Sequence, residues 1–111
     1  MNIIKTVDIL TSLAQETRLK TFKALVKSGV DGIAAGEIGN KIKVPQNTMS
    51  FHLAHLKKSG LVKSKRQGRS VIYSVDFNMA EKLVKFLLES CCSDSKEKCP
   101  IAMKFTDIIL K

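Results

Sequence analysis

The sequence predicts a mainly α-helical fold that carries one β-hairpin, and three observations support this prediction. Apolar residues recur at helical spacing over most of the first 60 positions. A loosely alternating stretch, 61–66, and a stretch rich in β-branched residues, 70–75, flank a glycine-containing connection at 67–69. A short helix, a tight turn and a longer polar helix directly precede this hairpin. Helix, turn, helix and hairpin in this order predict a winged helix-turn-helix.

The first two predicted helices cover residues 3–14 and 16–28. Apolar residues of the first helix form one broad stripe: Ile3, Ile4, Val7, Ile9, Leu10, Leu13 and Ala14. A terminal helix with this much apolar surface is expected to pack against a second subunit as well as against its own core. The second helix ends at Gly29, and its expected buried face consists of Leu19, Phe22, Leu25 and Val26.

A turn at residues 30–32 leads to a short helix over 35–42 and then to the central helix of the chain. The central helix is expected to have Pro45 at its first helical position and Gly60 just past its end. Its expected core face is Met49, Leu53 and Leu56. Its opposite face carries short or planar hydrogen-bonding side chains and no carboxylate: Gln46, Asn47, Thr48, Ser50 and His52. Such groups can contact base edges and phosphates in a major groove.

The hairpin after this helix has a basic tip formed by Arg66, Gln67 and Arg69. A further helix is predicted to start at Asn78 with a capping box and to end near residue 90. Its apolar residues cover more than one face: Leu83, Val84, Phe86, Leu87 and Leu88. We therefore expect a homodimer built from the first and last helices of domain 1–90. A two-fold dimer presents its two recognition helices to half-sites ~34 Å apart.

The charge of the chain favours a polyanionic partner. The net charge is +9 over 111 residues, and no acidic residue lies between Glu37 and Asp76. That interval contains eight basic residues: Lys41, Lys43, Lys57, Lys58, Lys63, Lys65, Arg66 and Arg69. Double-stranded DNA is the first expectation and an anionic membrane surface the second. Since no apolar run has the length of a membrane span and the first residues do not resemble a secretory signal, we expect a cytoplasmic protein.

All three cysteines lie in the segment 91–111, which we expect to be a ligand-binding segment with a short helix over 101–110. Three clustered thiolates, Cys91, Cys92 and Cys99, suit a soft ion with a low coordination number. Trivalent arsenic forms three bonds and so fits three thiolate ligands, whereas zinc normally takes a fourth ligand. A redox sensor is an alternative, since Lys96 and Lys98 would lower the thiol pKa values. Incidental thiols without a regulatory role are a further alternative.

Several of these motifs together resemble the ArsR/SmtB family of bacterial winged-helix repressors. They are Thr17-Arg18-Leu19, residues 44–53 with 56–62, and Arg66-Gln67-Gly68-Arg69 with Tyr73. Two known sensor sites of that family are missing, because the helix at 35–42 has no cysteine pair and residues 78–90 contain no histidine. The Cys91-Cys92…Cys99 pattern is similar to an arsenic-responsive subgroup. This resemblance implies arsenite, and by extension antimonite, as an inducer bound by these cysteines.

The expected function is that of a repressor, not an enzyme, released from its operator when arsenic(III) binds. No catalytic residue or catalytic cofactor is expected. Two alternatives remain at this stage. A redox- or sulfide-sensing repressor would keep the fold and change the signal, and a small thiol metalloid carrier would leave the basic interval without a role.

Overall fold

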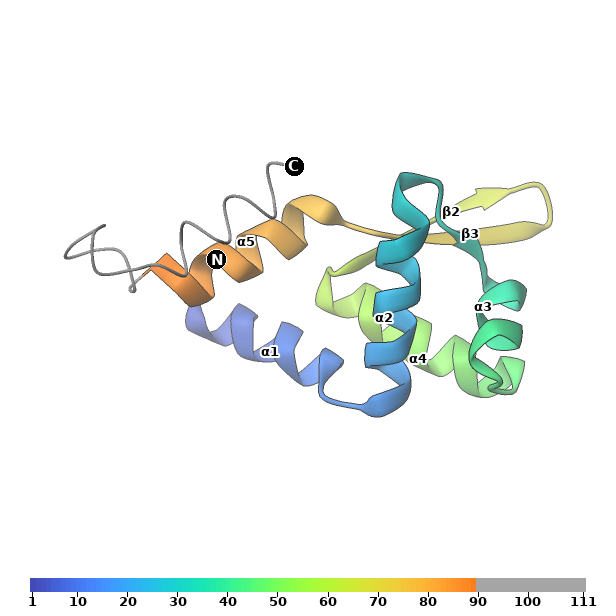
Figure 1. The fold of residues 1–111 in the computed structure, drawn as a ribbon, viewed down its shortest axis with the longest axis horizontal. Helices are drawn as coiled ribbons and strands as arrows, with labels where there is room; N and C mark the ends of the chain where they lie inside the picture. The colour runs from blue at the N-terminus through green and yellow to red at the C-terminus, as the bar shows by residue number, and fades with distance from the viewer. Residues whose placement is uncertain (90–111) are drawn as a thin grey trace.

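The computed structural model describes residues 1–89, which form the predicted winged helix-turn-helix (Figure 1). The helices in this part of the chain are α1 (Ile3–Leu13), α2 (Glu16–Ser28), α3 (Ala35–Ile42), α4 (Gln46–Ser59) and α5 (Phe77–Leu88). The strands are β1 (Ile33–Ala34), β2 (Val62–Gln67) and β3 (Ser70–Val75), and a 3₁₀ turn, η1 (Gly29–Asp31), precedes β1. The predicted fold class is confirmed, whereas the predicted segment 91–111 lies outside the described residues.

The sheet is antiparallel with the strand order β1-β3-β2. The hairpin register runs from Val62 opposite Val75 to Gln67 opposite Ser70. Its turn places Gly68 at φ 61°, a value that favours glycine. The short strand β1 was not predicted, because two residues are too few to show an alternating pattern.

One core lies beneath the recognition helix and joins all the other elements to it. Met49, Leu53 and Leu56 are fully buried, which confirms the predicted core face of α4. They pack with residues from the surrounding elements: Ile9, Leu25, Ile33, Ile38, Leu61, Val62, Val75 and Leu83. The position of α4 is therefore fixed by contacts with the helices on either side and with the base of the hairpin.

The apolar stripe predicted for α1 faces mainly outward, and the buried side of this helix is Thr6, Ile9 and Ser12. Ile3 and Val7 are 66% and 55% exposed, and Ile4 is 83% exposed. The physical reason is the close approach of α1 to α4, where the Ser12 and Ser59 hydroxyl oxygens lie 3.1 Å apart. Small side chains permit this approach, and the larger apolar side chains are left on the far side of the helix.

The prediction for α2 is half wrong. Leu25 is buried as expected, but Leu19 and Val26 are exposed, and Thr21 takes their place in the core. Thr21 donates its hydroxyl hydrogen to the Thr17 carbonyl at 2.8 Å. A threonine satisfied by its own helix can be buried without an unpaired polar group.

Two predicted helix starts are displaced. Pro45 is the residue before α4 rather than its first helical residue, and its carbonyl accepts from the Met49 N–H at 2.9 Å. Asp76, not Asn78, caps α5, because the Asp76 carboxylate accepts from the Met79 N–H at 3.1 Å. The Asp76 N–H also donates to the Leu61 carbonyl at 2.8 Å, so the helix starts directly where β3 ends.

Candidate nucleic-acid interface

The turn between α3 and α4 is tight and packs directly against Gly39 of α3. Lys43 adopts the left-handed conformation, φ 62° and ψ 48°, at the end of α3. The next N–H, that of Val44, donates to the Gly39 carbonyl at 3.0 Å. A Cβ on Gly39 would lie 3.1 Å from the Val44 carbonyl oxygen and 3.2 Å from Gln46 Oε1. The absence of a side chain at residue 39 therefore permits the helix-turn-helix geometry.

The surface of α4 opposite the core presents the candidate reading face. With about 100° between successive residues, the centre of this face is formed by Asn47, Ser50, Phe51, Ala54 and Lys58. All of these residues are exposed, and Gln46 and Thr48 are exposed on its two flanks. Among the predicted α4 contact residues, Gln46, Asn47, Thr48 and Ser50 thus lie on the surface and are available to a ligand.

His52 does not belong to this face, and its predicted placement there is wrong. It is only 8% exposed and lies on the same side of α4 as Met49 and Leu56. Its Nδ1 accepts a hydrogen bond from Arg18 Nη1 at 3.3 Å, since an arginine can only donate. Burial lowers the pKa of His52, and the positive charges of Arg18 and His55 lower it further. The spacing of three from Met49 and four from Leu56 could have revealed this position.

Arg18 was quoted in the resemblance but was not predicted to be a site residue. It donates from Nε to the Ser12 carbonyl at 2.6 Å and from Nη1 to His52. Ser12 in turn contacts Ser59 near the end of α4. We call Ser12, Arg18, His52 and Ser59 the polar cluster. It joins the end of α1, the start of α2 and the buried side of α4, so it helps to set the angle of the recognition helix.

The hairpin supplies the second part of the candidate interface. Its tip residues Arg66, Gln67 and Arg69 are exposed, as are Lys63 and Lys65 along β2. The hairpin extends toward the end of the molecule where α3 ends and α4 begins, whereas α1 and α5 lie toward the opposite end (Figure 1). Since no carboxylate occurs between Glu37 and Asp76, no acidic side chain of this stretch offsets the positive charge of α4 and the hairpin.

Residues 1–89 contain no group of three or more histidine, cysteine or carboxylate side chains arranged to hold a metal ion. The predicted ligands Cys91, Cys92 and Cys99 lie outside these residues. Within the same part of the chain, no helix has both the length and the apolar character needed to cross a membrane.

Comparison with known proteins agrees with this geometry. A family model described as a helix-turn-helix domain matches residues 13–65, from the end of α1 into β2. An uncharacterized HTH-type transcriptional regulator of Methanocaldococcus jannaschii is 31% identical over 85 residues, which cover 77% of this chain and 93% of that protein. The chain belongs to the helix-turn-helix transcriptional regulators.

Two solved structures are similar to this regulator. HlyU from Vibrio cholerae, named a transcriptional activator, is 26% identical to this regulator. The match to its structure covers 81% of the regulator and 95% of the HlyU chain, with a TM-score of 0.64. A second HlyU structure is described as the reduced protein. A homodimeric winged helix-turn-helix DNA-binding domain from Mycobacterium bovis, described as a possible ArsR-family regulator, has a TM-score of 0.66 at 21% identity and covers 79% of this chain and 80% of that chain. The regulator therefore has an ArsR-like fold.

Proposed function

We propose that this regulator is a homodimeric, ArsR/SmtB-type repressor that inserts α4 into the major groove of an operator. The observation that carries the proposal is the outer face of α4. It is exposed, carries Gln46, Asn47, Thr48 and Ser50, and has no carboxylate, while the opposite face of the same helix is fixed in the core. A helix held in this way can present side chains to base edges without reorganising.

The two surfaces have different roles in this proposal. Gln46, Asn47, Thr48 and Ser50 contact base edges and nearby phosphates from α4. Arg66, Gln67 and Arg69 contact the flanking backbone or minor groove from the hairpin tip. The lysines between Glu37 and Asp76 add phosphate contacts, which increase affinity for any DNA sequence. His52 and the polar cluster orient α4 from behind and do not touch the duplex.

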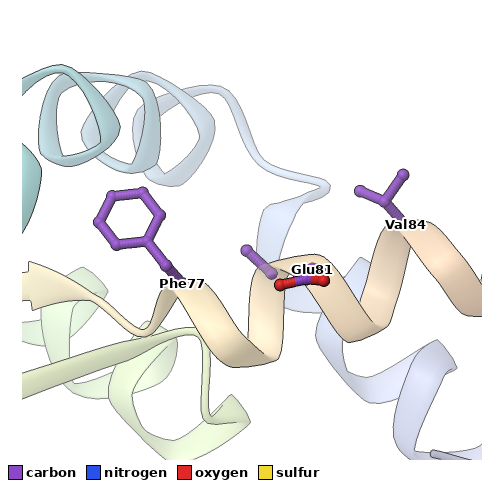
Figure 2. A pocket seen from close by; sticks show the side chains of 4 residues that line it. Phe77, Glu81 and Val84 are labelled. Carbon is purple, nitrogen blue, oxygen red and sulfur yellow. The ribbon is translucent and has the colours of Figure 1, made fainter. Parts of the chain in front are cut away.

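Exposed apolar surfaces on α1 and α5 support the dimer. Ile3, Val7 and Leu10 form an outward stripe on α1. On α5, Phe77 and Val84 project from the same side of the helix, with Glu81 between them (Figure 2). They line a pocket of about 280 Å³. A second copy packed through these helices would cover both surfaces and would place two α4 helices ~34 Å apart for successive half-sites.

Selection of a binding site from random duplexes, followed by affinity measurements, tests the DNA proposal. Asn47→Ala and Ser50→Ala should each weaken binding to the selected site, with about 5- to 150-fold loss where a good base contact is removed. Lys23→Ala, an exposed substitution on α2, is the matched control and should change little. Equal affinity of both α4 variants and the control would contradict the assignment of α4.

The inducer is the second part of the proposal. We infer that Cys91, Cys92 and Cys99 bind arsenic(III), arsenite or antimonite, and that binding releases the operator. The support is the number and clustering of the thiols in the sequence and the resemblance to the arsenic-responsive subgroup. A coupling of ~1–3 kcal/mol would weaken DNA binding about 5- to 150-fold. Arsenite titration of the operator complex should fail to release Cys91→Ser, Cys92→Ser and Cys99→Ser variants, whereas Ser95→Ala should respond as the wild type does.

A redox signal through the same thiols is the second candidate. The existence of a reduced form of the relative HlyU favours it. Mass measurement of the operator-released protein distinguishes the two signals. A bound arsenic atom supports metalloid sensing, whereas a mass loss of two hydrogens after oxidant supports a disulfide switch. Either signal would act on a cytoplasmic DNA-binding protein and would require no enzymatic turnover.

A further inference from the structure

Phe51 is an exposed aromatic residue in the middle of the candidate reading face. Its side chain is 64% exposed, whereas the other large apolar residues of α4, Met49, Leu53 and Leu56, are fully buried. Asn47 lies one turn before it and Ala54 one turn after it, and both are exposed. Phe51 and Ala54 thus form an apolar strip between polar and basic groups on the side of α4 that faces away from the core.

The Phe51 ring is supported by two neighbouring histidines. It packs edge-on against His52 at a centroid distance of 5.7 Å and lies 6.4 Å from the ring of His55. His52 is itself held by Arg18. A side chain with this support loses less conformational freedom on binding than an unsupported one, so the ring is prepared for an apolar contact outside the protein.

The major groove offers one apolar group on its base edges, the C5-methyl group of thymine. We propose that Phe51, together with Ala54, contacts thymine methyl groups and makes this regulator select thymine at that position of each half-site. This inference rests on the proposed insertion of α4 into the major groove. Asn47 and Ser50 would bind hydrogen-bonding groups on the neighbouring bases. The two kinds of contact would therefore select the base at different positions of the operator.

Replacement of thymine by deoxyuridine tests the inference, because it removes the methyl group and keeps every hydrogen-bonding group. The operator is the site that the full-length wild-type chain selects from random duplexes, and each thymine is replaced in turn. Wild type should bind the operator about fourfold more weakly when one contacted thymine methyl group is removed. It should bind about 15-fold more weakly when the equivalent methyl group is removed from both half-sites. Phe51→Ala should lose most of the preference for the thymine operator over the deoxyuridine operator, while Phe51→Leu should retain a larger part of it.

Asn47→Ala is the matched control, since it should lose affinity for the operator and keep the preference for thymine over deoxyuridine. Circular dichroism and urea unfolding of Phe51→Ala should match the wild type, because the side chain is exposed. Equal binding of wild type to every thymine and deoxyuridine duplex, at full affinity, would overturn the inference and leave the DNA-binding proposal standing. Failure of wild type to bind any duplex would overturn both.

Discussion

Arg18 Nη1 lies 3.3 Å from Nδ1 of His52, and this contact joins the start of α2 to the buried side of the recognition helix. The same guanidinium donates from Nε to the Ser12 carbonyl at the end of α1. One side chain therefore links the helix proposed to pair two subunits with the helix proposed to contact DNA. A shift of α1 at the subunit interface would act on α4 through this link.

Replacement of Arg18 should destabilise the fold. Arg18→Ala removes a charged donor from both Ser12 and His52, and the expected loss in the free energy of unfolding is about 1.5–3 kcal/mol. Arg18→Lys should restore little, because an ammonium group cannot reach both acceptors with the geometry of a guanidinium. Urea unfolding measures both variants. Lys23→Ala on the exposed side of α2 should stay within about 0.5 kcal/mol of wild type, and a similar effect at both positions would contradict the role of Arg18.

The lowered pKa of His52 predicts that stability falls in acid. The unfolded state binds a proton near pH 6.5, whereas the folded state resists protonation because His52 is buried beside Arg18. The contribution of neutral His52 to the free energy of unfolding is therefore fully present above pH 6.5. It is lost as the pH falls from 6.5 toward the lower pKa that His52 has in the folded protein. Urea unfolding of wild type and His52→Gln across this range should show a smaller pH dependence for the variant. An identical dependence would contradict the role of His52 in the loss of stability in acid.

Gly39 and Gly36 provide a matched pair for the helix-turn-helix contact. Alanine in place of the exposed Gly36 in the first turn of α3 should stabilise the protein by up to ~1 kcal/mol, because a Cβ at this position meets nothing within 4 Å. At Gly39 the same Cβ would lie 3.1 Å from the Val44 carbonyl. We expect Gly39→Ala to be less stable than Gly36→Ala by about 1 kcal/mol or more in thermal or urea unfolding. Equal values would show that the turn can widen without loss.

A carboxylate on the outward stripe of α1 should dissociate the proposed dimer. Val7→Glu would place two unpaired charges in a two-fold interface, and the dimer dissociation constant should rise about 30-fold or more. Sedimentation equilibrium measures this constant. Val30→Glu is the control, because Val30 is 83% exposed and follows α2 rather than lying on α1 or α5. A dimer that tolerates Val7→Glu as well as Val30→Glu would place the interface elsewhere.

The order of the elements could be predicted because local signals mark it. Gly29, Gly60 and Gly68 mark the helix ends and the hairpin turn, and the spacing of Met49, Leu53 and Leu56 gives the core face of α4. The orientation of α1 could not be predicted from hydrophobicity, since it depends on contact between Ser12 and Ser59, which lie 47 residues apart. The same limit applies to Thr21, whose hydroxyl is satisfied by its own helix.

The surface position of the candidate α4 residues could be predicted where chemistry and periodicity agree. Asn47 and Ser50 are polar and fall opposite the core, and the structure places both on the surface. His52 was misplaced because its polarity was given more weight than its position, and Arg18, the partly buried arginine that bonds to it, comes from another helix. Phe51 was not predicted to be a site residue, because the predicted face was chosen by hydrogen-bonding side chains and Phe51 has none. The roles of Cys91, Cys92 and Cys99 remain predictions.

The salt dependence of operator binding tests most directly whether the hairpin and α4 hold a duplex. Each phosphate contact contributes about −0.9 to the slope of log affinity against log salt concentration. The double variant Arg66→Ala/Arg69→Ala should therefore show a slope that is shallower by about 2, with Lys23→Ala unchanged. Wild-type affinity that is independent of salt, or a slope that is the same in wild type and the double variant, would contradict the proposed interface.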